Sequence, residues 1–143
     1  MVAVYRAPMR SRRDDVDMRA TIARARRLDI CGFGDVPHDA RLARRIERFA
    51  DVAIGSLAWT RDADGLYWLG RIEGPYFRDS SEEATDVDLI HVRACRWLTT
   101  PSLEPQVPAG VVATFARGGR NFQQTHDPAV GPQSERIWNA ASQ

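Results

Sequence analysis

Two segments in the middle of the chain alternate bulky apolar residues with polar ones. They span residues 67–76 and 91–98. A period of two is typical of a strand that buries one face. The sequence at 62–65 predicts a turn, since Gly65 suits the positive φ that closes many hairpins. We therefore expect strands at 52–60 and 66–77 to form an antiparallel hairpin, followed by a strand at 87–98.

The flanking segments predict helices and shorter strands. A helix capped by Asp14 or Asp15 is expected through about residue 27, and a second should follow Asp39, because Leu42, Ile46 and Phe49 recur at helical spacing. Further elements are expected as strands at 2–5, 28–34 and 121–125, a loop at 78–86, a short helix at 109–116 and a last docked turn near 137–138. This order indicates an α+β domain with one core.

The two central segments resemble a known family. The first matches aromatic-x-x-Gly-x-x-x-Gly-Pro-Tyr from Tyr67 to Tyr76, and the second matches His-x-Arg-x-x-x-Trp-Leu from His91 to Leu98. Both are similar to the PUA-like superfamily, in particular the EVE-type modules that accompany modification-dependent restriction endonucleases. The resemblance implies a PUA-like pseudo-barrel of mostly antiparallel strands with flanking helices over residues 1–126. Residues 127–143 would form a partly docked C-terminal tail.

The resemblance also implies a function. Domains of this kind hold a nucleobase, often a modified one, in an aromatic pocket. We therefore expect a reader that extrudes a modified base from nucleic acid, with DNA favoured over RNA, in a restriction, defence or regulatory pathway. Any cleavage would come from a partner nuclease or defence protein.

A base reader needs flat side chains for stacking and polar groups for the base edge. Phe33, between two glycines, Trp59, beside the hairpin turn, and Tyr76 are the stacking candidates. Strand aromatics are more often core residues, and Trp68 and Trp97 are expected in the core.

The polar candidates are His91, Arg93, Arg120 and Asn121. His91 and Arg93 share one face of their strand, where they would contact a base or phosphate. The alternative is a satisfied polar pair, with Arg93 bound to an acid such as Glu73.

Arginines at three positions are candidates for phosphate contacts. Arg41 and Arg44 lie on the polar face of the helix after Asp39, and Arg117 follows the last predicted helix. Guanidinium groups suit phosphate. A solvated helix surface would give the same pattern.

The composition limits the kinds of ligand binding and catalysis that this chain can support. All 20 basic residues are arginine and the net charge is +1, so nucleic-acid binding requires a local basic patch. The missing lysine excludes Schiff-base, phosphate-loop-lysine and Asp…Glu-x-Lys nuclease chemistry. The histidines and the two cysteines lack metal-ligand spacing, so we expect no metal, no cofactor and no catalytic residues.

Other sequence features bear on location and on rival functions. No apolar run approaches the ~18 residues of a membrane span and the start carries no signal peptide, so we expect a cytoplasmic protein without membrane contact. The reader has two rivals: a non-catalytic protein-interaction module of the same fold, and a small enzyme acting on nucleosides.

Overall fold

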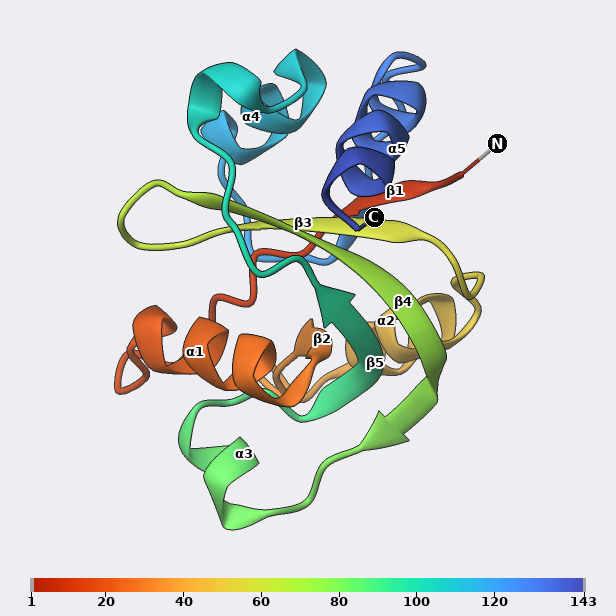
Figure 1. Cartoon of the computed structure of the whole chain (residues 1–143). Helices are drawn as coiled ribbons and strands as arrows, with labels where there is room; N and C mark the ends of the chain where they lie inside the picture. Colours follow the sequence, from red (N-terminus) through yellow and green to blue (C-terminus); the bar gives the residue numbers. More distant parts are fainter. Residues whose placement is uncertain (1, 143) are drawn as a thin grey trace.

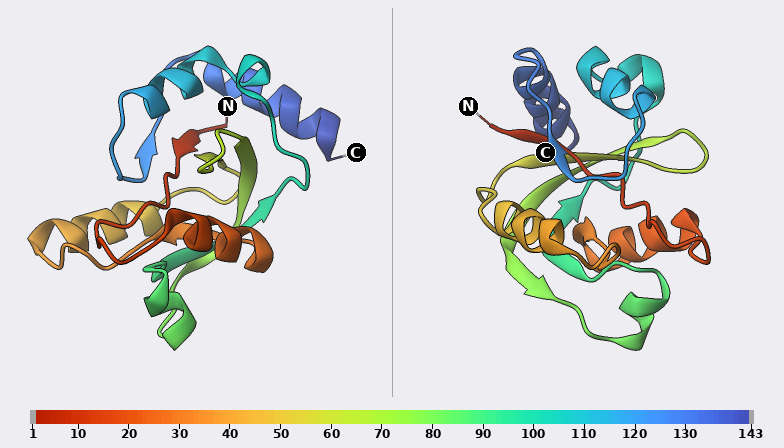
Figure 2. Two further views of the ribbon diagram at one scale, coloured as in Figure 1. Left: turned by 90° about the vertical axis from the view of Figure 1, so that its left-hand side faces the viewer. Right: turned by 180° about the vertical axis from the view of Figure 1, so that it is seen from behind.

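The computed structural model describes residues 2–142, which form a six-stranded sheet and five α-helices. The strands are β1 (Val4–Arg6), β2 (Ile30–Phe33), β3 (Leu57–Arg61), β4 (Tyr67–Arg78), β5 (His91–Trp97) and β6 (Gln123–Gln124). The helices are α1 (Met18–Leu28), α2 (Ala40–Ala50), α3 (Glu82–Asp86), α4 (Ala109–Ala116) and α5 (Val130–Ala141), with a 3-10 turn at Glu104–Gln106. Figure 1 shows α4 and α5 above β3 and α1 and α2 below it, level with β2 and β5, and Figure 2 shows the same arrangement from two other sides.

The strands are ordered β2-β5-β4-β3-β1-β6, and only the β1–β3 pair is parallel. A register shift between Ile72 and Tyr76 bends β4, whose last residues then pair with the first residues of β5. Within residues 2–142, the outer strands β2 and β6 do not pair with each other, so the sheet is open. The predicted α+β class with mostly antiparallel strands is confirmed, whereas closure into a pseudo-barrel is not.

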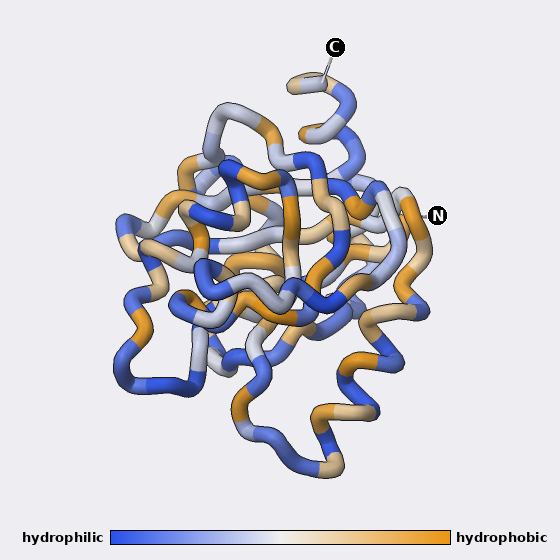
Figure 3. The backbone as a smooth tube through the Cα atoms, turned by 90° about the horizontal axis from the view of Figure 1, so that it is seen from below, coloured by the Kyte–Doolittle hydropathy of each residue, from blue (hydrophilic) through white to orange (hydrophobic). Residues whose placement is uncertain are grey.

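The hairpin strands are buried on both faces, because helices cover both sides of the sheet. Trp59 and Leu69 join a cluster that includes Trp138 of α5, whereas Trp68 and Ile72 join a second cluster that includes Ile22 of α1 and Phe49 of α2. The expectation of one buried face was therefore wrong for residues 67–70 of β4 and residues 91–93 of β5, where successive residues are all buried. Trp68 and Trp97 are core residues, as predicted. Figure 3 shows how closely hydrophobic and hydrophilic residues alternate along the backbone.

Side-chain caps begin three of the helices, α1, α2 and α3. Asp39 accepts hydrogen bonds from the backbone N–H groups of Arg41 and Leu42, so α2 begins where the sequence predicts. Asp17, rather than Asp14 or Asp15, caps α1. Helix α4 spans the predicted residues 109–116.

The structure differs from the predicted elements in two acid-rich or Pro-rich segments. The predicted loop at 78–86 contains α3, which is capped by Ser81 and whose Ala84 is buried in the core. Beyond residue 127, a 12-residue helix replaces the predicted single turn and buries Val130 and Trp138. No helix within residues 2–142 has the length and apolarity needed to cross a bilayer.

Candidate functional site

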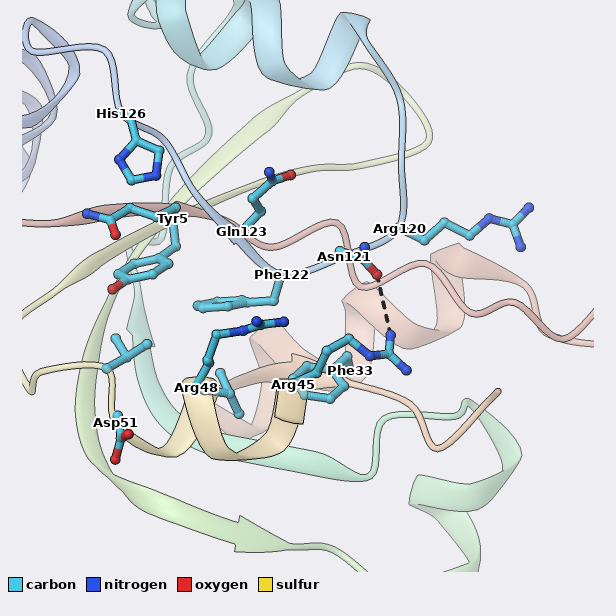
Figure 4. Close-up of a pocket in the computed structure, with 13 residues that line it drawn as sticks. Tyr5, Phe33, Arg45, Arg48, Asp51, Arg120, Asn121, Phe122, Gln123 and His126 are labelled. Carbon is cyan, nitrogen blue, oxygen red and sulfur yellow. Dashed lines mark hydrogen bonds between the residues drawn. The ribbon is translucent and has the colours of Figure 1, made fainter. Parts of the chain in front are cut away.

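A cleft of about 620 Å³ opens between α2 and the segment that contains β6. Tyr5 and His126 lie at one end, and Arg45 and Arg120 lie at the other (Figure 4). The cleft is lined by aromatic, cationic and amide side chains, namely Tyr5, Phe33, Arg45, Arg48, Phe49, Asp51, Val52, Arg120, Asn121, Phe122, Gln123, Gln124 and His126. It is therefore flat-walled and apolar inside, with a polar, mostly cationic rim.

Four aromatic rings form a continuous surface in this cleft. Tyr5 and Phe122 stack on each other with ring centroids 4.9 Å apart, and Phe122 meets the edge of Phe49 at 4.8 Å. Phe33 meets Phe49 at 5.1 Å from the other side. Phe49 is buried, whereas the other three are half-buried and can offer a ring face to a ligand.

Glycines and a buried carboxylate fix the strand end that carries Phe33. A Cβ on Gly32 would lie 1.8 Å from the backbone oxygen of His91, and one on Gly34 would lie 2.0 Å from Asp88 Oδ2. Asp88 accepts hydrogen bonds from the Asp35 N–H at 3.0 Å and the Ser11 hydroxyl at 2.6 Å. At both positions a side chain would clash with neighbouring protein atoms, so glycine leaves the space that those atoms occupy.

His91 and Tyr76 lie behind Phe33 rather than in the cleft. His91 Nε2 is 2.7 Å from a carboxylate oxygen of Asp35, and its Nδ1 is 2.8 Å from the Tyr76 hydroxyl. Because a carboxylate only accepts, Nε2 carries the hydrogen, and Nδ1 of the neutral ring accepts from Tyr76. Burial lowers the pKa of His91 and outweighs the opposing effect of Asp35. Both residues support the Phe33 wall.

Arg93 is a structural residue. It is 2% exposed, and its guanidinium donates to the carbonyl oxygens of Gly74 at 2.8 Å, Phe49 at 3.0 Å and Val52. Phe49 lies in the last turn of α2 and Val52 follows its C-cap, so the guanidinium lies at the helix C-terminus, where a cation is favoured. The hydrogen-bonding groups of Arg93 are therefore satisfied within the protein, as in the alternative interpretation of the sequence. The partners are backbone carbonyls instead of Glu73.

Trp59 is also far from the cleft. Its side chain is 0% exposed on the opposite face of the sheet, and its indole Nε1–H donates to the Ser134 hydroxyl of α5 at 3.0 Å. Trp59 therefore joins β3 to α5 and is in no position to stack on a ligand.

A buried arginine holds the segment that forms the upper wall. Arg6 of β1 donates to the carbonyl oxygens of Thr114 and Gly118 at 3.0 and 2.7 Å, and to that of Asn121 at 3.3 Å. It also reaches the side-chain oxygen of Gln123 at 2.9 Å. These contacts place Asn121 and the neighbouring Phe122 opposite α2.

The helix arginines line a second hollow beside the cleft. This groove of about 300 Å³ is lined by Arg12, Pro37, Asp39, Arg41, Arg44, Arg45, Arg48 and Asn121. The predicted residues Arg41 and Arg44 therefore lie together here. Asn121 lines both the groove and the cleft, whereas Arg120 lines the cleft alone of the two. Arg117 is exposed at the end of α4 and lines neither hollow.

Sequence reasoning missed Tyr5, Phe122 and His126 as site residues. Tyr5 and Phe122 come together because β1 pairs with β6, with Tyr5 opposite Gln124. An Arg-Asn-Phe-Gln-Gln run after two glycines was the available signal, since it mixes an aromatic ring with groups that bind base edges. Among residues 2–142, no group of three or more His, Cys, Asp or Glu side chains is arranged to hold a metal ion.

Comparisons with known proteins give a likeness of fold. No family model and no curated protein matches the sequence. Among solved structures, the chain is similar to the YTH domain of Zygosaccharomyces rouxii MRB1 in complex with N6-methyladenosine RNA, with a TM-score of 0.53, 10% identity and coverage of 97% of this chain and 86% of that one. It is also similar to the Pho92 YTH domain in complex with m6A, with a TM-score of 0.55, 9% identity and coverage of 99% and 84%. At such low identity the likeness is one of fold.

Proposed function

We propose that this chain is a reader of a modified base in nucleic acid. The observation that carries the proposal is the aromatic cleft with arginines on its rim. A flat base entering it would contact the ring faces of Phe33 and Phe122. The NH2 groups of the Asn121 and Gln123 amides, whose oxygens already accept from arginines, can donate to its edge. The arginine groove beside it suits the phosphates of the same strand.

We propose single-stranded RNA as the ligand and N6-methyladenine as the first base to test. Support comes from the two YTH domains of similar fold, which are described in complex with N6-methyladenosine RNA or with m6A. Neither comparison supports the DNA preference, the restriction setting or the nuclease partner inferred from the sequence. The EVE-type assignment and the cytoplasmic location stay predictions.

The proposal is tested by removing one ring at a time. Phe33→Ala or Phe122→Ala should weaken binding of methylated single-stranded RNA by roughly 1–3 kcal/mol, because one stacking face is lost, and should leave its salt dependence unchanged. Phe77→Ala is the matched control, since Phe77 is 46% exposed and does not line the cleft. Fluorescence anisotropy titrations measure the affinities, and melting curves check that each variant is folded.

Equal affinities for all three folded variants would remove the cleft from the binding site. A charge variant gives the complementary result. Arg44→Gln should lower the slope of log affinity against log salt by about 0.7, as expected for one lost phosphate contact with a single strand.

A further inference from the structure

Arg12 and Arg45 converge on one neutral oxygen. The Oδ1 atom of Asn121 accepts from Arg12 Nη2 at 3.1 Å and from Arg45 Nη1 at 3.3 Å. Arg12 precedes α1, Arg45 lies on α2 and Asn121 precedes β6, so three distant segments of the chain meet here. Figure 4 shows the contact between Arg45 and Asn121.

The positive charge around this oxygen has no carboxylate partner in residues 2–142. None of the five groove arginines (Arg12, Arg41, Arg44, Arg45 and Arg48) forms an ion pair. The one acid that lines the groove, Asp39, accepts hydrogen bonds from the first N–H groups of α2. Burial lowers the pKa of Arg45, and repulsion by Arg12 and Arg48 lowers it further against the opposing effect of Asp39. Such a cluster is stabilised by an anion.

The Arg45 side chain also has unused hydrogen-bonding capacity. Its Nε and Nη2 atoms are buried and have no partner, and its guanidinium lies 5.8 Å from the centre of the Phe33 ring. Nε and Nη2 form one planar edge of the guanidinium, the edge that binds two oxygens of a phosphate side by side. The guanidinium makes one hydrogen bond within residues 2–142, to Asn121 at 3.3 Å. Phosphate binding therefore requires a turn of this side chain that brings the buried edge into the groove.

We propose that Arg12 and Arg45 form a phosphate subsite for a phosphodiester next to the base in the cleft. This inference rests on the proposed function. Arg45 lines both the cleft and the groove, so it can bind the phosphate beside the base that contacts Phe33. In the bound state the two non-bridging oxygens of the phosphodiester accept hydrogen bonds from Nε and Nη2 of Arg45, and Arg12 adds a second positive charge from across the groove.

The test neutralises single phosphates. The probe is a short single-stranded RNA with one central N6-methyladenine, in which each linkage in turn is an uncharged methylphosphonate. One or two linkages beside the methylated base should weaken binding to the unaltered protein by roughly tenfold. The Arg45→Gln and Arg12→Gln variants should bind the parent RNA roughly tenfold more weakly than the unaltered protein does. Replacing the sensitive linkages by methylphosphonate should not weaken their binding further. Arg45→Lys should resemble Arg45→Gln, because it keeps the charge but loses the two-atom edge.

Arg27→Gln is the control, since Arg27 is exposed on α1 and lines neither hollow. This variant also removes one positive charge. The methylphosphonate linkages beside the methylated base should weaken its RNA binding by the same factor as they do for the unaltered protein. If the parent RNA binds but every variant shows the same linkage profile as the unaltered protein, the subsite is wrong and the reader stands. If no RNA binds to folded protein, the reader and the subsite both fail.

Discussion

Two aromatic residues on opposite faces of the sheet have opposite roles in this account. Phe122 offers a half-buried ring in the cleft, whereas Trp59 is fully enclosed and bonded to Ser134. Trp59→Phe should leave RNA affinity unchanged and lower the free energy of unfolding by about 1 kcal/mol, because the Ser134 hydroxyl loses its partner. Urea denaturation and anisotropy titration measure the two quantities. A large loss of affinity in folded Trp59→Phe would indicate that the ligand binds on the Trp59 face of the sheet, which would contradict the proposed cleft.

His91 makes stability depend on pH. Burial keeps its folded-state pKa below the value of about 6.5 expected in the unfolded chain, so the unfolded state takes up the proton first. Stability should therefore be full above about pH 6.5 and should fall as the pH drops below it. Burial raises the pKa of Asp35, but the hydrogen bonds from His91 and Arg78 outweigh it and hold that pKa below its usual range, so Asp35 contributes only at more acidic pH.

The matched variant for this effect is His91→Gln, which retains hydrogen-bonding capacity without a titrating ring. Its melting temperature should be lower than that of the unaltered protein at pH 7.5 and should change less between pH 7.5 and pH 5. Thermal melts across that range measure both profiles. Identical slopes for the two proteins would assign the pH dependence to other groups.

At the scale of elements, Arg93 joins the end of α2 to β4. Arg93→Met keeps the length of the side chain but leaves the buried carbonyls of Gly74, Phe49 and Val52 without their donor. We expect a loss of about 3 kcal/mol or more in the free energy of unfolding, measured by urea denaturation. Arg71→Met on the partly exposed face of β4 is the control, and a similar loss in both would contradict the special role of Arg93.

Local sequence signals identified the elements they mark directly. Pro108 and Gly118 border α4, and Asp39 caps α2, so both helices could be predicted closely. Helix α5 was missed because Gly131 and Pro132 resemble a break in structure. Both residues lie in its first turn, where proline is tolerated since no intrahelical N–H bond is lost.

At the scale of the whole molecule, the site depends on contacts that no local pattern encodes. The sequence named Phe33, Arg120 and Asn121, which do line the cleft, but Tyr5 meets Phe122 only through the pairing of β1 with β6. Trp59 was misplaced for a related reason. Its strand alternation does not reveal that α5, from the far end of the chain, covers that face of the sheet.

The open cleft also bears on the rival functions. An interaction module that had lost its pocket would have side chains filling this space, and here a cavity of about 620 Å³ remains. The acid and the histidine that line this cleft, Asp51 and His126, are both exposed on its rim.

The most direct test compares two RNAs that differ by one methyl group. Anisotropy titrations at physiological salt would use a short single strand with N6-methyladenine or adenine at its centre, together with the DNA pair of the same sequence. We predict that the methylated RNA binds at least about fivefold more tightly, because the aromatic cleft buries the methyl group, and that Phe122→Ala reduces this preference. Equal affinity for both RNAs, or a preference that persists unchanged in folded Phe122→Ala, would contradict the account.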